Sequence, residues 1–417
     1  MSARRLGAGT LELGGGLEVL VAAALEGVAP GGEIEVALAS RAAALELPAW
    51  ARIAGHEVTD ERTGKEAGAT RFLVRIRRGT VARRLGGELP PRGEALAAED
   101  GTLDMESLRG SLGDAPAEAS ADAGLVPLGA LAEPGGRGYA WQLNERDRLW
   151  AEEISDLTES AAADQWDATT DIPWEAVDGL PDHVERAVAQ VMTYIAQNEY
   201  AALYVPARFL PQVNPQYAEV LLWLSSHVHD EARHVEVFTK RSLAGGARAH
   251  ALASTELSLH TLLAERDFTG SALLLTVLGE GTFLDLLRFV EQHAPDAATA
   301  AAARLAHRDE RRHVHFGISH VRGRIESDPD ARPALVGAAE ARAAKLTSLS
   351  GLNPLLTEAL TVMSAPSLQL AEISETAAEV RALLVRMDEN RRRRLRAAGF
   401  DEATARHLSE LHTPNLM

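Results

Sequence analysis

From Tyr139 onward, hydrophobic residues recur at the three- and four-residue spacing that places them on one face of an α-helix. The longest such stretches, each predicted to be an amphipathic helix, are residues 182–210, 215–243, 269–293 and 296–327. At least two more helices are expected, near residues 333–348 and 368–398, where Gly399 is placed to end the second. The pattern predicts a mainly α domain: a four-helix bundle with extra helices.

The first 80 residues show a different pattern, in which strand and helix signals alternate. Residues 33–40 alternate apolar and polar positions after a turn at Pro30 and Gly31, and residues 71–78 alternate again. Between them, residues 42–53 have helical periodicity. We expect a small α+β domain over residues 1–80 and the helical domain over residues 139–417.

The stretch between these domains, residues 81–138, has no sustained periodicity. It is rich in alanine and acidic residues and is interrupted by Pro90-Pro91 and by Pro134-Gly135-Gly136. Proline and glycine at this density break helices and strands, so the stretch is predicted to be a linker.

Composition and charge exclude several classes of protein. The formal net charge of -18 argues against nucleic acid or an anionic membrane as a partner. The basic run at residues 391–394 follows Asp388 and Glu389 at helical pairing distance, so we interpret it as a solvated helix face. No segment offers eighteen uncharged apolar residues, so no membrane-spanning helix is expected and the protein is predicted to be cytoplasmic. With no cysteine, any metal must be held by carboxylates and imidazoles.

Six polar residues interrupt the apolar faces of the four long helices, at positions where a core is expected. They are Glu199 in the first helix, Glu231 and His234 in the second, Glu280 in the third, and Glu310 and His313 in the fourth. Each half of the set consists of a lone Glu followed by a Glu-x-x-His. The two glutamates are 32 residues apart in the first half (Glu199 and Glu231) and 30 apart in the second (Glu280 and Glu310). This order is the ligand pattern of di-iron and di-manganese carboxylate bundles.

Electrostatics supports the same assignment. Four carboxylates that converge in an apolar core cannot all remain ionised without compensating charge, and two divalent cations supply it. Glu and His three residues apart lie on one helical face and can reach a shared metal. Oxygen and imidazole donors without sulfur suit iron or manganese. We therefore expect two iron ions, with a manganese–iron pair as the alternative.

The residues that flank the ligands repeat as well, because both motifs read Asp-Glu-x-Arg-His. In each motif the Arg is three residues from the Asp, and the Asp could accept the free N–H of a ligating imidazole. Asp230, Arg233, Asp309 and Arg312 are therefore expected to support the ligands. A single Glu-x-x-His is more often an ordinary solvated helix face, but two matched motifs favour a metal site.

Two further histidines lie one turn before the motifs. His227 is four residues before Glu231, and His307 is three before Glu310. Either could be an extra metal ligand. The competing interpretation, which we favour at this point, is a hydrogen-bonded core or surface histidine.

With these residues identified, residues 139–327 resemble the ferritin-like di-iron superfamily. The stretches Gln165-Trp166-Asp167 and Asp171-Ile172-Pro173-Trp174 are similar to the branch that holds the ribonucleotide reductase small subunit and the di-iron oxygenases. The resemblance implies that the six Glu and His residues bind two irons that activate dioxygen. In the tyrosyl-radical reductases a tyrosine follows the first Glu-x-x-His by one turn, whereas this chain has Phe238 there. An ordinary reductase subunit is therefore not expected.

The first domain resembles the small TusA-like sulfur-carrier fold, through Gly14-Gly15-Gly16-Leu17, Leu47-Pro48-Ala49-Trp50 and its closing strand. Members of that family carry a cysteine at the position that Gly14 occupies here. Without a thiol, sulfur transfer does not carry over, and we interpret the domain as a docking or substrate-presenting module.

The leading hypothesis for function is a dinuclear iron or manganese–iron oxygenase or oxidase that uses dioxygen to oxidise a small organic substrate, with electrons from a separate donor. One alternative is a ferroxidase or iron-handling ferritin-like protein. Another is a non-enzymatic partner-binding protein with a structural metal. A homodimer is compatible with each of them.

Overall fold

The computed structural model describes residues 4–66, 68–80, 103, 105, 108, 124–128, 130, 137–177, 179–346, 354–365 and 367–412. The chain divides into two compact units, Met1–Ala95 and Leu96–Met417. Most of the predicted linker lies outside the described residues, so the proposed boundaries at residues 80 and 138 stay a prediction. Within the second unit, the Gln216 side chain donates to the carbonyls of Val126 and Pro127.

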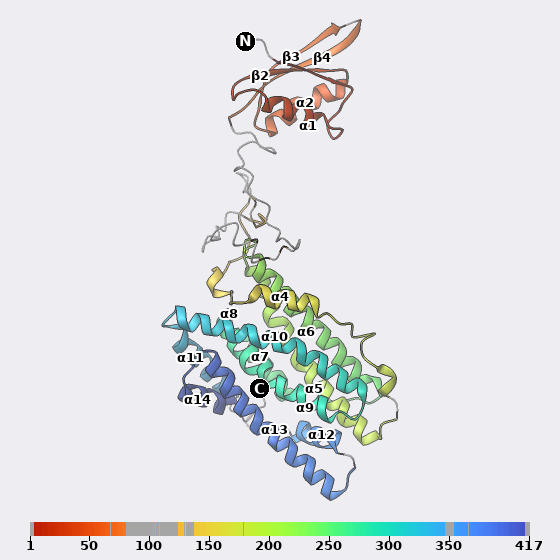
Figure 1. The fold of residues 1–417 in the computed structure, drawn as a ribbon, viewed down its shortest axis with the longest axis vertical. Helices are drawn as coiled ribbons and strands as arrows, with labels where there is room; N and C mark the ends of the chain where they lie inside the picture. The colour runs from red at the N-terminus through yellow and green to blue at the C-terminus, as the bar shows by residue number, and fades with distance from the viewer. Residues whose placement is uncertain are drawn as a thin grey trace. The chain divides into compact units, whose positions relative to one another are not determined.

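The first unit is a four-stranded sheet with two helices, which confirms the small α+β domain expected from the sequence (Figure 1). Its elements are β1 (Arg4–Gly9), α1 (Leu17–Glu26), β2 (Glu33–Leu38), α2 (Arg41–Ile53), β3 (Glu57–Glu66) and β4 (Ala69–Arg77). The strand order is β1-β2-β4-β3, with β1 parallel to β2 and the other pairs antiparallel. The sequence analysis found β2, α2 and β4 but assigned no secondary structure to β1, α1 or β3.

Alternation along the strands gives the sheet one apolar and one charged face. Val36 and Val74, which pair across β2 and β4, are buried with residues of α1 and α2 in one core. On β2 and β4, Glu35 pairs with Arg75, and Arg62 of β3 also contacts Glu35. The buried core holds the two helices against the sheet, and the ion pairs join the neighbouring strands on the charged face. The resemblance to the TusA-like fold stays a prediction.

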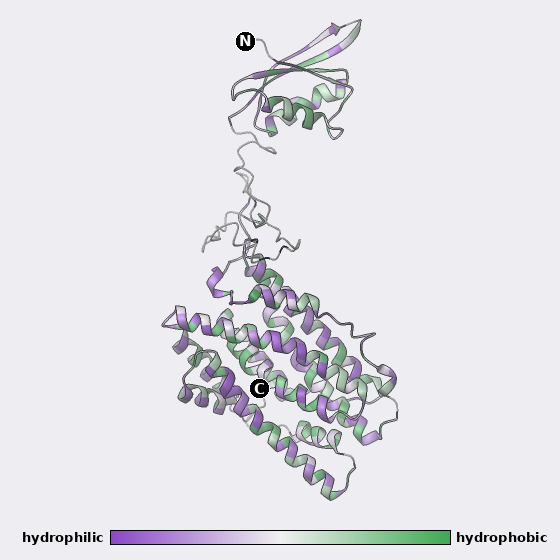
Figure 2. Cartoon of the chain, in the orientation of Figure 1, coloured by the Kyte–Doolittle hydropathy of each residue, from purple (hydrophilic) through white to green (hydrophobic). Residues whose placement is uncertain are grey.

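The second unit is a helical bundle, and Figure 2 shows hydrophilic and hydrophobic residues mixed along its long helices. The bundle consists of α5 (Asp182–Ala207), α6 (Ala218–Ala244), the π-helix η5 (Ala272–Glu280) that continues into α9 (Gly281–His293), and α10 (Ala297–Ser327). Around it lie α4 (Ile154–Ala163), α7 (Ala253–Ala264), α8 (Phe268–Ser271), α11 (Ala331–Leu346), α12 (Pro354–Ser364), α13 (Leu370–Ala397) and α14 (Glu402–His412), with short 3-10 turns η2 (Arg146–Arg148), η3 (Trp174–Val177) and η4 (Leu210–Gln212). The predicted starts and ends of the four long helices agree with the structure to within about three residues. The mainly α, ferritin-like fold class is confirmed.

Two apolar clusters fill the bundle, and every long helix contributes to both. On α5, Ile195 belongs to one cluster and Val205 to the other; on α10, Ala306 belongs to the first and Phe316 to the second. The switch falls at the same level on each helix, where the predicted ligands lie. A layer of polar side chains therefore separates two hydrophobic cores.

Two details of the helical prediction were wrong. Residues 269–293 were expected to form one regular α-helix, but nine of them form η5. The run at residues 391–394 is not simply a solvated face: Arg391 is 1% exposed and hydrogen-bonds Thr282, and Arg394 pairs with Asp285. The two further helices that were located in the sequence correspond to α11 and α13, and α12 and α14 are additional helices. Among the helices of the described residues, none has the length and apolarity needed to cross a membrane.

Candidate metal centre

Four helices deliver the six predicted ligands to one buried layer. Glu199 comes from α5, Glu231 and His234 from α6, Glu280 from the last residue of η5, and Glu310 and His313 from α10. Each of them is at most 4% exposed. Carboxylates in a protein interior without compensation are expensive, so the layer requires a partner of opposite charge.

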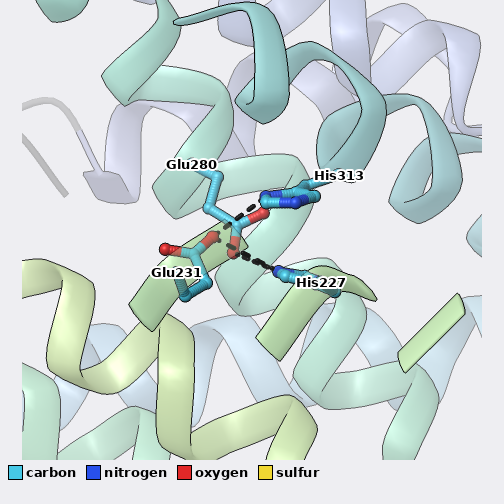
Figure 3. Close-up of side chains that lie close together, drawn as sticks. All are labelled: His227, Glu231, Glu280 and His313. Carbon is cyan, nitrogen blue, oxygen red and sulfur yellow. Dashed lines mark ion pairs between the residues drawn. The ribbon is translucent and has the colours of Figure 1, made fainter. Parts of the chain in front are cut away.

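The ligand atoms form two adjoining clusters that share Glu231. The first, which we call position A, consists of Glu199, Glu231, His234 and Glu310. The second, position B, consists of His227, Glu231, Glu280 and His313 (Figure 3). Within each cluster one ligand atom from every residue lies within 4.8 Å of the others, which is the spacing that a single bound ion requires.

Two carboxylates lie between the positions. One oxygen of Glu231 is 3.3 Å from Nδ1 of His234, and its other oxygen is 2.9 Å from Nδ1 of His313. Glu310 repeats this arrangement, with one oxygen 3.5 Å from each of the same two nitrogens. The geometry makes Glu231 and Glu310 suited to bridge two ions, while Glu199 and Glu280 each serve one side.

The donor atoms of this layer lack hydrogen bonds. Across the described residues, no hydrogen bond reaches seven carboxylate oxygens and three imidazole nitrogens of the layer, all of them buried: Glu199 Oε1, both oxygens of Glu231, Glu280 and Glu310, His227 Nε2, His234 Nδ1 and His313 Nδ1. Native proteins satisfy nearly all buried polar atoms, so ten unsatisfied atoms in one place need an explanation. Oxygen and imidazole donors aimed at two common points fit two divalent metal ions.

The second nitrogen of each ligating imidazole meets an aspartate of the opposite motif. Nε2 of His234 lies 3.3 Å from Asp309, and Nε2 of His313 lies 3.3 Å from Asp230. Contact with the carboxylate favours a proton on Nε2 and leaves Nδ1 with its lone pair toward the metal position. The sequence suggested that the aspartates could serve the histidines; the crossing between α6 and α10 was not anticipated.

The two arginines of the motifs hold the two aspartates. Arg233 pairs with Asp230 at 2.5 Å and with Asp309 at 2.8 Å. Arg312 pairs with the same two carboxylates at 3.2 and 2.6 Å. Two positive and two negative charges therefore balance one another, and the four ligand carboxylates remain to be balanced by metal.

Trp166 is a partner of this group whose role the sequence analysis did not identify. Its Nε1 donates to Asp309 at 2.7 Å, and its ring lies beneath the Arg233 guanidinium. Only the position of Trp166 before the first ligand helix, within the family-like stretch, pointed to it. Which side chain it would contact depends on tertiary packing.

The pKa values in the protein without metal reflect this crowding. Burial raises the pKa of Glu199 well above its ordinary value and that of Glu280 to about 7. Burial acts in the same direction on Glu231, but the charge of His234 and close contacts with the imidazoles of His227 and His313 outweigh it and hold the pKa of Glu231 well below its usual range. Burial disfavours the charged imidazoles, yet the surrounding carboxylates raise the pKa of His234 and of His313 well above normal. Protons shared among these groups take the place that metal charge would fill.

The two additional histidines have different surroundings. His227 lies in position B, 3.3 Å from Glu280 and 3.5 Å from Glu231, so the interpretation favoured from the sequence, an ordinary core or surface histidine, does not describe its location. His307 is half-buried and lines a surface groove with Asp285 and Arg311. It belongs to neither cluster.

The residue at the reductase radical position is fully buried. The ring of Phe238 lies 6.4 Å from that of His234 and carries no oxidisable hydroxyl. Tyr194 is buried and stacks on Phe283, whereas Tyr200 is 46% exposed.

A narrow apolar cavity adjoins the layer. Its volume is about 30 Å³. Three of the ligands, Glu199, Glu280 and Glu310, line it together with Asn198, Ala202, Leu259, Leu262, Leu275, Gly279, Phe283 and Arg342. A second apolar cavity, lined by His227, Phe268 and Phe316 among others, approaches from the position B side.

Comparison with known proteins gives a distant structural likeness. No protein-family model and no curated protein matches the chain. Among solved structures it is similar to three single-residue variants of an "R2-like ligand-binding oxidase" with an aerobically reconstituted Mn/Fe cofactor. The first variant is 14% identical over 61% of this chain and 94% of its own, with a TM-score of 0.42. The second is 16% identical over 61% and 94%, with a TM-score of 0.43, and the third is 15% identical over 63% and 92%, with a TM-score of 0.42.

The fold is therefore assigned from the chain's own geometry. Four long helices carry a lone Glu, a Glu-x-x-His, a second lone Glu and a second Glu-x-x-His into one buried layer. The second unit is a ferritin-like helical bundle with a layer of side chains able to hold two metal ions.

Proposed function

We propose that the helical unit is a dinuclear metal oxidase or oxygenase, in which iron, or manganese and iron, is held by Glu199, Glu231, His234, Glu280, Glu310 and His313. The observation that carries the proposal is the set of ten buried donor atoms without hydrogen bonds, divided between two positions that share Glu231. When bound, such a metal pair would supply the activation of dioxygen for oxidation of a small organic substrate.

The rest of the layer holds the ligands in place and keeps water out. Asp230 and Asp309 orient the imidazoles, and Arg233 and Arg312 hold those aspartates. The two apolar cores on either side leave little room for solvent. Rigid ligands in a dry site are what reactive oxidation chemistry requires, because water would quench or divert it.

The cavity beside Glu199, Glu280 and Glu310 is where a substrate would bind. Its walls include Leu259, Leu262 and Phe283. We infer a slim and largely apolar substrate, because a bulky one would require these side chains to move and an ionic one would lose its hydration without gaining enough partners.

Metal content and oxygen consumption test the proposal. The full-length protein should bind about two Fe(II) ions per chain under anaerobic conditions, and the loaded protein should consume dioxygen. Glu310→Ala should lose most of the metal and the oxygen uptake. Glu326→Ala, an exposed glutamate on the same helix, serves as the control and should retain both. Unchanged metal content in Glu310→Ala would refute the site.

The number of Fe(II) ions oxidised per chain separates the alternatives. An oxidase or oxygenase without an added reductant should stop after its two bound ions are oxidised. A ferroxidase would continue through many added equivalents, and a protein with a purely structural metal would consume no dioxygen. Either of the last two results would contradict the proposed function.

A further inference from the structure

Positions A and B differ in the number of imidazoles among their donors. Glu231 and Glu310 lie between the positions, and each position has one carboxylate of its own, Glu199 in A and Glu280 in B. Position A has one imidazole, whereas position B has two, because His227 joins His313 there. With Glu310 counted as a carboxylate of both positions, because its oxygens lie 3.5 Å from Nδ1 of His234 and of His313, the remaining difference between the positions is His227.

The geometry of His227 is that of a ligand rather than of a core residue. Its ring stacks on the ring of His313 with centroids 3.8 Å apart; Nε2 of His227 lies beside Glu231 and Glu280, and Nδ1 of His313 lies beside Glu231 (Figure 3). The side chain is 2% exposed. Two parallel imidazoles that approach the same carboxylates can occupy adjacent positions around one ion.

A buried histidine elsewhere in the unit shows what a structural role looks like. His320 is 1% exposed, and both of its nitrogens have partners: Nε2 lies 3.0 Å from the Thr269 hydroxyl and Nδ1 lies 2.7 Å from the Trp150 carbonyl. By contrast, Nε2 of His227 has no hydrogen-bond partner among the residues that the structure describes. A buried nitrogen without a partner is costly unless something else occupies its lone pair.

We propose that His227 is a seventh protein ligand, which completes position B with a second imidazole and makes the two metal positions chemically unlike. The inference rests on the proposed two-metal site and adds to it. Position B then has up to five protein donors, two of them nitrogens, and position A has four with one nitrogen. An ion in position A would therefore have more coordination positions open to a ligand that does not come from the protein.

The difference has a consequence for metal choice. Imidazole favours iron over manganese more strongly than carboxylate does. Position B should therefore select iron, while position A, richer in oxygen donors, should accept manganese or iron. In a mixture of both metals, iron is expected to fill position B first.

The test compares two histidines that each lie one turn before a Glu-x-x-His motif. His227→Gln removes the imidazole from position B, and His307→Gln, in the surface groove, is the matched control. Full-length proteins are loaded anaerobically with ⁵⁷Fe(II), and Mössbauer spectra and bound iron are measured. Circular dichroism checks that each variant keeps its helices.

The wild-type protein should show two different ferrous environments in equal amounts. His227→Gln should lose or shift one of them, with an affinity at that position at least about tenfold lower, and His307→Gln should match the wild type. From equimolar Mn(II) and Fe(II), His227→Gln should take up a larger share of manganese than the wild type does.

A rescue experiment separates ligation from packing. In His227→Gly, added imidazole should restore the lost ferrous environment, because the free base can fill the vacated position. Unchanged spectra and iron content in His227→Gln would overturn the inference, as would loss of iron in His227→Gly that imidazole does not restore. Failure of the wild-type protein to bind two ions would overturn the proposed function, and this inference with it.

Discussion

Replacing Gly317 with alanine should disturb the metal layer from one helical turn away. Gly317 lies on α10, four residues after His313, and faces Thr276 of η5, which is four residues before Glu280. A Cβ atom at position 317 would lie 1.9 Å from Oγ1 of Thr276 and 2.7 Å from its Cβ. The absence of a side chain at Gly317 therefore sets how closely the two helices approach.

The size of the effect follows from these distances. Ordinary contact begins near 3.4 Å, so α10 and η5 would have to separate by about 1.5 Å, from 1.9 to 3.4 Å. Thr276 cannot easily turn away, because it is β-branched and its hydroxyl bonds the Ala272 carbonyl. Overpacking of this kind costs up to about 3 kcal/mol. Alanine has a higher helix propensity than glycine, which stabilises the helix by about 1 kcal/mol. The net decrease in the free energy of unfolding is therefore about 2 kcal/mol.

Gly323 provides the matched control on the same helix. It is exposed, and a Cβ atom there would meet nothing within 4 Å. Gly323→Ala should therefore gain about 1 kcal/mol from helix propensity alone. The free energy of unfolding of the metal-free proteins is measured with denaturant, and Fe(II) binding is measured in parallel. Gly317→Ala should also bind less iron, because the displacement reaches Glu280.

A double-mutant cycle identifies the contact responsible. Thr276→Ala removes the nearest atom, so the combination with Gly317→Ala should be more stable than the sum of the single effects predicts. If Gly317→Ala proved as stable as Gly323→Ala and bound two irons, the argument that this close approach positions η5 would be refuted.

Three other predictions concern charge, ligand support and the domains. Burial raises the pKa of Glu280 to about 7, and neighbouring carboxylates raise the pKa of His234 despite its burial. Between about pH 4.5 and pH 7 the folded, metal-free protein therefore binds more protons than the unfolded chain does. Its denaturation midpoint should therefore fall between pH 5.5 and pH 8, Glu280→Gln should flatten the fall, and a midpoint that rises would contradict the sign. Asp309→Asn should destabilise the protein by about 3–5 kcal/mol in denaturant unfolding and weaken metal binding about 10- to 100-fold in Fe(II) titrations, whereas the exposed Asp182→Asn should do neither. A chain shortened to residues 96–417 should keep its helical circular dichroism and two metals per chain; loss of metal would show that the first unit completes the site.

Helical periodicity was enough to locate the metal layer, because its residues break an otherwise apolar face. Glu199 and Glu310 stand out in the sequence for the same reason that they are buried in the structure: each lies on the core side of its helix. Asp296 marks the start of α10 just as clearly, since its side chain accepts the backbone N–H of Thr299. Local signals of this kind are independent of the rest of the fold.

Features that depend on distant contacts could not be predicted in this way. Residues 272–279 are apolar apart from Thr276 and Gly279, so no polar position reveals the wider turn of η5. The sequence predicts a solvated Arg394 because its partner, Asp285, is 109 residues away in the chain. The aspartate crossing likewise requires knowledge of which helices face each other.

Because of this crossing of imidazoles and aspartates, the distance between α6 and α10 is coupled to whether metal is bound. Each ligating imidazole spans from a metal position on one side to an aspartate of the opposite helix on the other. A change in helix separation must therefore move a ligand, and a bound ion must in turn fix the separation. The layer thus acts as a spacer of defined length within the bundle, so that loading with metal would stiffen the surrounding helices and any motion that parts them would loosen the ions.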